Sequence, residues 1–342
     1  MKAAILVETG KPLVVDEVAL PERLEYGQVL VRIRASGICG SQIGEIDGVK
    51  GPDKFLPHLL GHEGGGVVEE TGPGVRHVKP GDRVVLHWRK GAGIEAPTPK
   101  YRWGGRAVNA GWVTTFNEQA VVSENRVTAV PADVDFEVAA LLGCAVTTGL
   151  GVVVNDAKVR IGESVAVYGV GGVGLCVVQG AALAGAWPII AIDRDPAKLA
   201  MAMTFGATHA LDTAAGPAAA EIRRIAGAAG VDAAIDTTGH VPLIEEAYEV
   251  TSARGRTVLV GVPRAGEKAR FSTLPLHFDK TIRGSHGGQA DPAHDIPRYV
   301  NLWRQGRLRL AEMITHTFAL EGINDAVALL RAGGAGRCVV RM

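Results

Sequence analysis

The stretch SVAVYGVGGVGLCVVQGAALAGAWPIIAID (164–193) decides the fold of this chain. It begins with an apolar run at 164–169 that is typical of a buried strand, and it continues as helix-like sequence at 172–186. A second apolar run at 187–193 completes the pattern. A strand, a helix and a second strand within about 30 residues form a βαβ unit with parallel strands. We therefore expect a parallel sheet here.

A glycine motif lies where the first strand meets the helix. Gly169, Gly171 and Gly174 spell G-x-G-x-x-G, Gly172 opens the helix, and Asp193 ends the next strand 19 residues after the last of the three. Such glycines allow a tight turn, let a pyrophosphate approach the backbone, and let helix and strand pack closely. A glycine triplet alone also fits an ordinary turn. With the strand context and the terminal acid, it predicts a dinucleotide site at the helix N-terminus.

The acid at the end of the second strand bears on which dinucleotide binds. Asp193 can accept hydrogen bonds from both hydroxyls of an adenosine ribose and would repel a 2′-phosphate, so NAD is favoured over NADP. Arg194 follows it and could pair with that phosphate, or it could be a solvated surface charge. Strictness for NAD over NADP therefore stays open.

The rest of the chain divides around this unit. Further strand-like runs at 231–239 and 257–263, each preceded by helix-like sequence, predict a doubly wound parallel sheet. Before residue 145, short strand-like runs broken by Pro and Gly indicate an antiparallel, barrel-like domain. The segment 286–342 has short strands that suit a return to that first domain. The chain is thus predicted to be an α/β protein.

Composition narrows the function class. The 342 residues carry 36 Lys plus Arg and 36 Asp plus Glu, so no overall field favours nucleic acid or an anionic membrane as a partner. No apolar run approaches the roughly 20 residues of a membrane span, and the N-terminus has no signal-like stretch. We expect a cytoplasmic protein, whose four widely spaced cysteines are thiols or metal ligands.

Three further motifs resemble the zinc-containing medium-chain alcohol dehydrogenases, and this resemblance covers essentially the whole chain. They are SGICGS (36–41), GHEGGG (61–66) and LLGCAVTTG (141–149). The resemblance places the catalytic zinc ligands of the family on Cys39, His62 and Cys144. It implies a GroES-like β-barrel catalytic domain formed by 1–145 and 286–342, and a Rossmann NAD-binding domain at 146–285.

The proposed ligand set suits this chemistry on its own terms. Two thiolates and one imidazole leave a tetrahedral zinc one open position, as a catalytic site requires. Zinc makes an alcohol bound there more acidic, which prepares it to lose hydride. Taken singly, a buried Cys is more often a small apolar residue and a lone His is more often structural.

The resemblance also assigns residues around the metal. Glu63 matches an acid that can approach the zinc, although a plain surface Glu is the alternative, and Ser41 matches the hydroxyl that accepts the alcohol proton. Two positions depart from the family. Gln42 replaces an Asp that orients the zinc-bound His; its amide can still accept from the imidazole N–H but adds no charge. Gly44 stands where some relatives have a relay histidine, so the proton exit path is open.

Other assignments follow from the same resemblance. Contacts with the dinucleotide fall on Thr148, Val173, Lys198, Val260, Val262 and Arg337. Trp88 falls at the substrate pocket, and His286 falls at its inner end, where a hydroxyl-rich substrate and a structural histidine are equally compatible.

The span 89–116 differs from relatives that hold a second, structural zinc there with four cysteines. It contains no cysteine, so we expect one zinc per chain. It is also locally basic, with five cations against Glu95: Arg89, Lys90, Lys100, Arg102 and Arg106. This charge either selects an anionic alcohol or belongs to a solvated loop.

The leading interpretation is reversible, NAD-linked oxidation of a primary or secondary alcohol to an aldehyde or ketone. A polyol, sugar-alcohol, sugar-alcohol phosphate or 3-hydroxy amino acid dehydrogenase would have the same site. A zinc-free reductase of the same superfamily and a non-catalytic dinucleotide-binding protein are further alternatives. By analogy we expect a homodimer or homotetramer acting on a small molecule, with edge strands joined near 257–263. The substrate is not identified by the sequence.

Overall fold

The computed structural model describes residues 1–214, 216–334 and 336–342, which form two compact units. The first unit comprises Met1–Ala145 and Asp291–Met342, and the second comprises Val146–Ala290. Residues 286–290, predicted to belong with the first unit, group with the second. The reason is close backbone packing: a Cβ on Gly288 would lie 2.4 Å from the carbonyl oxygen of Thr148. The carbonyl of Gly288 also accepts a hydrogen bond of 2.9 Å from Asn155.

The second unit is built on a six-stranded sheet in the order β13-β12-β11-β14-β15-β16. Every pair of neighbours is parallel, which confirms the predicted doubly wound sheet. The chain moves outward from β11 to β13 and then returns to the other side of β11 at β14, and such a reversal leaves a crevice at the carboxyl ends of the strands. The strands are β11 (Val165–Tyr168), β12 (Ile189–Asp193), β13 (His209–Asp212), β14 (Val231–Asp236), β15 (Thr251–Leu259) and β16 (Thr281–Gly284).

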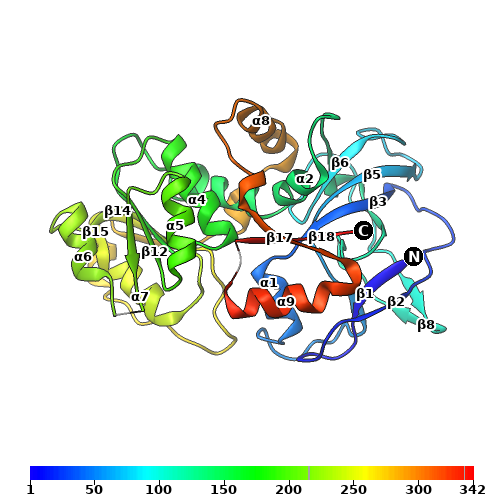
Figure 1. Ribbon diagram of the computed structural model, residues 1–342, viewed down its shortest axis with the longest axis horizontal. Helices are drawn as coiled ribbons and strands as arrows, with labels where there is room; N and C mark the ends of the chain where they lie inside the picture. Colours follow the sequence, from blue (N-terminus) through cyan, green and yellow to red (C-terminus); the bar gives the residue numbers. More distant parts are fainter. Residues whose placement is uncertain (215, 335) are drawn as a thin grey trace. The chain divides into compact units, whose positions relative to one another are not determined.

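Helices cover this sheet (Figure 1). Alternate strand residues pack in one apolar cluster with Ile222 and Val250 of α6 and α7. The helices α4 and α5 follow β11 and β12, and each also contacts the strand that comes after it. The helical segments of this unit are α3 (Ala145–Gly151), a π-helical turn η2 (Val152–Asp156), α4 (Gly172–Leu183), α5 (Pro196–Thr204), α6 (Ala219–Ala226), α7 (Val241–Val250), η3 (Leu274–Phe278) and η4 (Gly287–Gln289).

One edge of the sheet lies next to the segment 257–263, near which an edge strand was expected. The segment 257–263 contributes to β15, but β16 pairs with β15 on its outer side and forms the edge. Just before β16, Leu274 and Phe278 are each 67% exposed. The edge strand β16 is therefore preceded in the chain by a short segment with exposed apolar side chains.

The first unit is dominated by antiparallel sheets. Its largest sheet has the order β10-β6-β5-β3-β18-β17, with β9 paired to β3, and smaller sheets are β2-β1-β4 and β7-β8. The C-terminal strand β18 pairs with β3, so the end of the chain completes a sheet begun near its start. The strands are β1 (Lys2–Leu6), β2 (Val14–Glu17), β3 (Gln28–Gly37), β4 (His58–Leu59), β5 (Glu63–Thr71), β6 (Arg83–His87), β7 (Tyr101–Trp103), β8 (Arg106–Val108), β9 (Gln119–Ser123), β10 (Val127–Ala129), β17 (Ile314–Ala319) and β18 (Arg337–Arg341).

Alternation of apolar residues along these strands builds the interior of the first unit. In β3, Val29, Val31 and Ile33 point into one apolar cluster with residues of β5, β6 and β9. A second cluster joins β1 and β18 to the helices α1 and α9. The helical segments are α1 (Gly40–Ile46), η1 (Glu124–Arg126), α2 (Phe136–Leu142), α8 (Pro292–Arg304), η5 (Ala311–Met313), η6 (Leu320–Gly322) and α9 (Ile323–Ala332).

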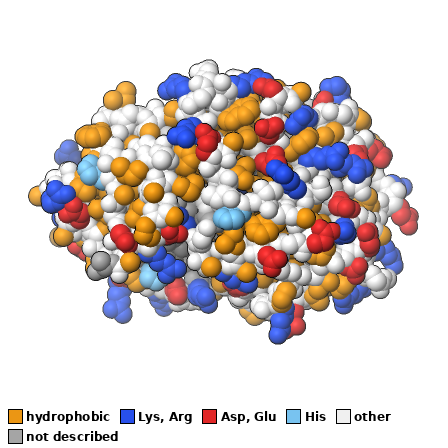
Figure 2. Space-filling model, viewed as in Figure 1, with side chains coloured by type: hydrophobic (Ala, Val, Ile, Leu, Met, Phe, Trp, Pro, Cys, Tyr) orange, Lys and Arg blue, Asp and Glu red, His pale blue; other side chains and the backbone are white. Residues whose placement is uncertain are grey.

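The surface carries both signs of charge. Figure 2 shows Lys and Arg side chains interspersed with Asp and Glu on the face in view, in keeping with the equal totals of the sequence. Among the described residues, no single helix is long and apolar enough to cross a membrane, and one bent pair, Phe136–Leu142 with Ala145–Asp156, passes by length and composition only.

Candidate active site

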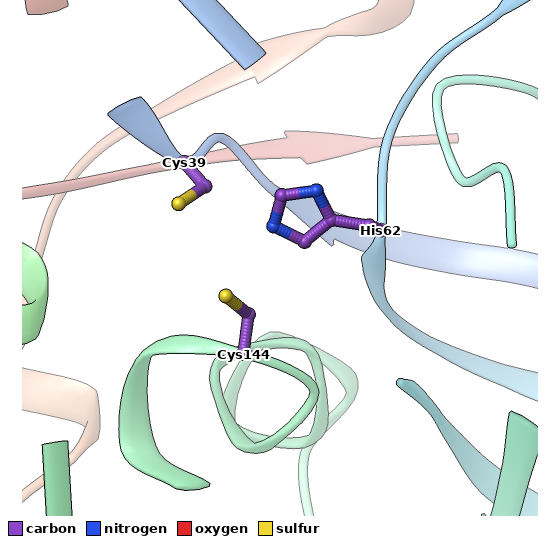
Figure 3. A group of neighbouring side chains, drawn as sticks. All are labelled: Cys39, His62 and Cys144. Carbon is purple, nitrogen blue, oxygen red and sulfur yellow. The ribbon is translucent and has the colours of Figure 1, made fainter. Parts of the chain in front are cut away.

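Three side chains converge in the first unit. The sulfur atoms of Cys39 and Cys144 and a ring nitrogen of His62 all lie within 4.8 Å of one another. Figure 3 shows the imidazole directed toward the two sulfurs. Three residues spread between positions 39 and 144 thus present three soft or borderline ligand atoms to a single point.

Each ligand lies where one element ends and another begins. Cys39 follows β3 and is the N-cap residue of α1, with extended backbone angles. His62 lies between β4 and β5, and Cys144 lies between α2 and α3. Cys144 is preceded by Gly143, where a Cβ would lie 2.3 Å from the carbonyl oxygen of Leu86. A glycine is therefore required for this segment to approach β6.

The protonation of these groups in the protein without metal is set by their contacts with one another. A hydrogen bond between the two thiols lowers the pKa of Cys39 well below its ordinary value and raises the pKa of Cys144 well above it. Burial lowers the pKa of His62, but the interaction with Cys39 outweighs it and the pKa is raised overall. The Nε2 atom of His62 is buried and has no hydrogen-bond partner among the described residues. A zinc ion would satisfy this nitrogen and favour the thiolate form of both cysteines, so the donor set fits zinc.

Glu63 and Arg337, assigned separately from the sequence, form an ion pair with each other. The guanidinium donates to Oε1 of Glu63, and both side chains are buried. Burial would lower the pKa of Arg337, but Glu63 outweighs it, so the pKa is raised and the guanidinium is charged. Burial raises the pKa of Glu63, and Arg337 opposes that shift. The pair places a carboxyl group and a charged guanidinium beside the ligand cluster, where both interact electrostatically with the cysteines.

Residues of α1 occupy different environments. Ser41 lies exposed in the first turn, two residues after Cys39. Gln42 is buried, but its Oε1 accepts from the backbone N–H of Gly61. The structure pairs this oxygen with the backbone just before His62 and shows no hydrogen bond from the imidazole to it among the described residues. Gly44 contributes no side chain to the cluster.

The second unit holds the glycine motif in the predicted geometry. Gly169 follows β11 with φ +82°, a conformation that favours glycine. Gly171 is the N-cap residue of α4, which begins at Gly172. A Cβ on Gly174 would lie 1.9 Å from the carbonyl oxygen of Gly169, so helix and turn can pack only with glycine there. The free N–H groups of the first helical turn are available to an anion.

Asp193 lies at the end of β12, where it lines a pocket and accepts hydrogen bonds from two backbone N–H groups. Its Oδ2 accepts from the N–H of Val170 at 2.9 Å, and its Oδ1 accepts from the N–H of Arg194 at 2.8 Å. Together with Gly169, the acid and Arg194 line a pocket of about 740 Å³. The carboxylate and the glycine turn thus face one cavity in the same unit.

The remaining predicted contacts lie elsewhere in this unit. Lys198 is half-buried in α5, and it is not among the residues that line this pocket. Val260 and Val262 line a different pocket, of about 280 Å³. Thr148 is buried in α3, and Val173 is half-buried in the first turn of α4. His286 precedes η4 and belongs to the second unit. Their roles stay predictions.

Comparisons with known proteins bear on this geometry. A family model described as "Alcohol dehydrogenase GroES-like domain" matches residues 25–132, and one described as "Zinc-binding dehydrogenase" matches residues 172–304. A chain named "Alcohol dehydrogenase class-3", from Cereibacter sphaeroides, is 34% identical, with 99% of each chain covered. The chain belongs to the zinc-containing alcohol dehydrogenases. The converging thiols and imidazole of this dehydrogenase are its catalytic zinc site.

Further relatives support the same family. The "S-(hydroxymethyl)glutathione dehydrogenase" of Paracoccus denitrificans is 35% identical, with 99% of each chain covered. Among solved structures, an "Alcohol dehydrogenase zinc-binding domain protein" from Burkholderia ambifaria has a TM-score of 0.91 at 32% identity and covers 100% of this chain and 98% of its own. The benzyl alcohol dehydrogenase of Acinetobacter calcoaceticus has a TM-score of 0.90 at 27% identity, with 100% and 99% covered.

A second pocket of this dehydrogenase reaches the zinc ligand His62. It measures about 550 Å³, and Trp88, which the resemblance placed at the substrate pocket, is among its lining residues. Its other large apolar side chains include Phe55 and Trp112, which are 58% and 57% exposed. Glu45 is its acidic member, and among the described residues no Lys or Arg lines it. The pocket therefore offers aromatic walls without a counter-charge for an anion.

The basic side chains of 89–116 are engaged in other contacts. Lys90 forms an ion pair with Glu95, and Arg106 stacks on the ring of Trp103, 4.3 Å from its centroid. The guanidinium of Arg89 lies 5.8 Å from the ring centroid of Trp88, which lines the pocket. This arrangement favours the interpretation of the segment as a solvated loop.

Sequence reasoning missed several residues of the 740 Å³ pocket. Thr213 follows β13, and Thr238 and His240 follow β14; all three line the pocket with Glu246 of α7. Ligands of doubly wound sheets bind at the carboxyl ends of the strands. Of these residues, only His240 directly follows a run that was predicted as a strand, 231–239, so its position was an available signal, whereas the strand before Thr213 was not predicted.

Proposed function

We propose that this enzyme is an NAD-linked alcohol dehydrogenase with one zinc per chain that oxidises neutral, apolar alcohols reversibly to aldehydes or ketones. The observation that carries the proposal is the aromatic pocket, which is lined by the zinc ligand His62 together with Trp88, Phe55 and Trp112. Such walls bury an apolar or aromatic substrate body favourably. The single zinc is supported by the absence of cysteine from 89–116.

Each part of the site has a defined task in this proposal. When bound, zinc supplies Lewis acidity toward the alcohol oxygen and the dinucleotide supplies the hydride acceptor. Cys39, His62 and Cys144 hold the metal and leave one position open. Ser41 accepts the alcohol proton through its exposed hydroxyl, a role that S41A would test by a loss of about 10²-fold in kcat. The buried ion pair of Glu63 and Arg337 holds two opposite charges in place beside the zinc ligands.

The preference for NAD rests on Asp193. Its carboxylate lines the nucleotide pocket and can accept from ribose hydroxyls, whereas a 2′-phosphate would meet its negative charge. Arg194 lines the same pocket, so the preference is tested by comparing kcat/KM for NAD and NADP. The wild type is expected to favour NAD, and D193A is expected to lose that preference.

We further propose a cytoplasmic homodimer or homotetramer that acts on a small molecule. The edge strand β16 and the exposed side chains of Leu274 and Phe278 support association through the second unit. Sedimentation of the purified protein tests the assembly; a monomer at all concentrations would contradict it.

A substrate panel tests the function. Purified enzyme with measured zinc content is assayed by NADH absorbance with benzyl alcohol, ethanol, glycerol and 4-carboxybenzyl alcohol. The proposal predicts the highest kcat/KM for benzyl alcohol and at least about a tenfold lower value for its carboxylated analogue, because the pocket lacks a basic partner. Preference for the carboxylated alcohol, lost in R89A, would instead establish an anion-selective enzyme. Preference for glycerol would establish a polyol dehydrogenase.

A further inference from the structure

Gln42 lies buried beside the segment that carries the zinc ligand His62. It is 5% exposed, and both ends of its amide have partners. Its Oε1 accepts from the backbone N–H of Gly61, and its Nε2 donates to Oε2 of Glu45 at 3.1 Å. The amide therefore joins helix α1 to the residue immediately before His62.

Gly61 has little freedom to respond if this contact is lost or changed. Its φ is +89°, and a Cβ there would lie 2.4 Å from Oγ1 of Thr115 and 2.7 Å from the backbone nitrogen of Phe116. The carbonyl of Leu60 accepts from the N–H groups of both those residues, at 3.0 and 3.1 Å. The backbone before His62 is thus held between residues 115–116 and the amide of Gln42.

The residue after His62 is fixed as well. The carbonyl of Glu63 accepts from Oγ of Ser36 at 3.1 Å, and that hydroxyl lies 2.7 Å from Oγ1 of Thr115. With its backbone held on both sides, the imidazole directs its buried Nε2 toward the sulfurs, as Figure 3 shows. The orientation of this ligand is therefore set through the main chain.

We infer that Gln42 is a positioning residue for the zinc ligand His62, acting through the N–H of Gly61, with Glu45 as the fixed partner of its amide. The inference rests on the zinc assignment of the proposed function. Outer residues that orient a metal ligand change metal retention by about 10- to 100-fold when they are altered. Here a neutral amide provides geometry without placing a charge on the imidazole.

The test is the rate at which zinc passes from the folded enzyme to a colorimetric chelator. Gln42→Met keeps the side-chain volume but leaves the N–H of Gly61 without its acceptor, so zinc release should accelerate by about 10-fold or more. Gln119→Met is the matched control, because Gln119 also donates to a carboxylate, that of Glu69 in the same unit. Its zinc release should equal that of the wild type. Thermal unfolding of each variant verifies that it is folded.

Two variants of Glu45 separate geometry from charge. Glu45→Gln keeps an acceptor for the amide of Gln42, so zinc retention should stay near the wild-type value. The exchange Gln42→Glu with Glu45→Gln reverses donor and acceptor between the two side chains but keeps an acceptor for Gly61, and it should release zinc within about threefold of the wild-type rate.

The inference is overturned if folded Gln42→Met releases zinc at the wild-type rate, if Gln119→Met accelerates release equally, or if the exchanged pair releases zinc as fast as Gln42→Met. Should Gln42→Met not fold, the exchanged pair and Glu45→Gln decide by the same rates. A wild-type enzyme that holds zinc but oxidises no alcohol would contradict the proposed function alone. A wild-type enzyme that takes up no zinc would overturn both.

Discussion

The zinc site and the loop 89–116 lie in the same unit but are held together by different chemistry. At the zinc site, Cys39, His62 and Cys144 converge and leave a buried nitrogen without a protein partner. The loop contains no cysteine, and a protein carboxylate, that of Glu124, joins it to the neighbouring backbone instead. The two oxygens of Glu124 accept from the backbone N–H groups of Arg76, His77 and Ile94, at 2.5, 2.8 and 2.8 Å.

Arg126 adds a second fixed connection to the same loop. Its guanidinium donates to the carbonyl of Trp88 and to Oε1 of Glu95, and it lies 4.9 Å from the ring centroid of Trp112. The loop is therefore stabilised by side chains of the protein itself, whereas the catalytic centre depends on a zinc ion that can be removed. Chelation should therefore change activity without releasing the loop.

Cys144→Ala should have the largest effect of the changes considered. Loss of one thiolate removes zinc and with it several kcal/mol of Lewis-acid stabilisation, so kcat should fall by roughly 10³-fold or more. NADH binding should persist, because the glycine motif and Asp193 lie in the second unit. Zinc analysis and NADH fluorescence titration measure the two properties. If the variant kept both zinc and turnover, the claim that the catalytic centre depends on zinc held by Cys144 would be contradicted.

Glu124→Ala should affect the loop and spare the metal. Three backbone N–H groups lose their acceptor, which should lower the free energy of unfolding by about 4 kcal/mol. Chemical denaturation measures this loss, and zinc content should stay at the wild-type value. Glu124→Gln is the control, since its amide oxygen still accepts and its cost should be about half. If the alanine variant lost zinc as readily as it lost stability, the two regions would not be independent.

Acidification should lower the free energy of unfolding through His87, which lies between Glu63 at the zinc site and Arg89 in the loop. Burial, with a contribution from Arg126, lowers the pKa of His87 to about 4 from its ordinary value of 6.5. In the unfolded chain His87 is therefore protonated below pH 6.5, whereas in the native state it is protonated only below about pH 4. Stability is fully present above pH 6.5 and should fall by up to about 3 kcal/mol on acidification to pH 4.

Denaturation curves across this pH range measure the effect. His87→Gln is the comparison, because it lacks the titrating group while cysteine protonation at the zinc site continues unchanged. The difference between the two proteins should shrink as the pH falls. Identical pH dependence in both would show that His87 does not contribute.

Trp112→Ala should have the smallest effect. The ring is 57% exposed at the pocket rim, so its loss should lower kcat/KM for benzyl alcohol by about fivefold, as expected for one aromatic contact. Zinc content should not change. Steady-state kinetics with benzyl alcohol and ethanol would test this, and an equal loss for both alcohols would count against an aromatic subsite.

Patterns tied to backbone geometry were predictable from the sequence. The apolar runs around Gly169 and Gly174 identified the parallel sheet because only glycine permits the turn and the close packing found there. Cys39, His62 and Cys144 were identified through their motifs, which fix chemically distinctive residues at element boundaries.

Side-chain choices among several available partners were not predictable. The sequence does not reveal that Gln42 accepts from Gly61 rather than from the imidazole, since both groups lie within reach of one flexible amide. It likewise does not reveal that Arg337 pairs with Glu63, because the two are 274 positions apart and meet only through the pairing of β18 with β3 and of β3 with β5.

The central claim is that a zinc held by Cys39, His62 and Cys144 enables alcohol oxidation. The most direct test measures zinc content and benzyl alcohol oxidation in the same sample before chelation, after chelation and after zinc is restored. We predict one zinc per chain at the start, activity that falls in proportion to zinc removed, and recovery on its return. Undiminished turnover in protein freed of zinc would contradict the account.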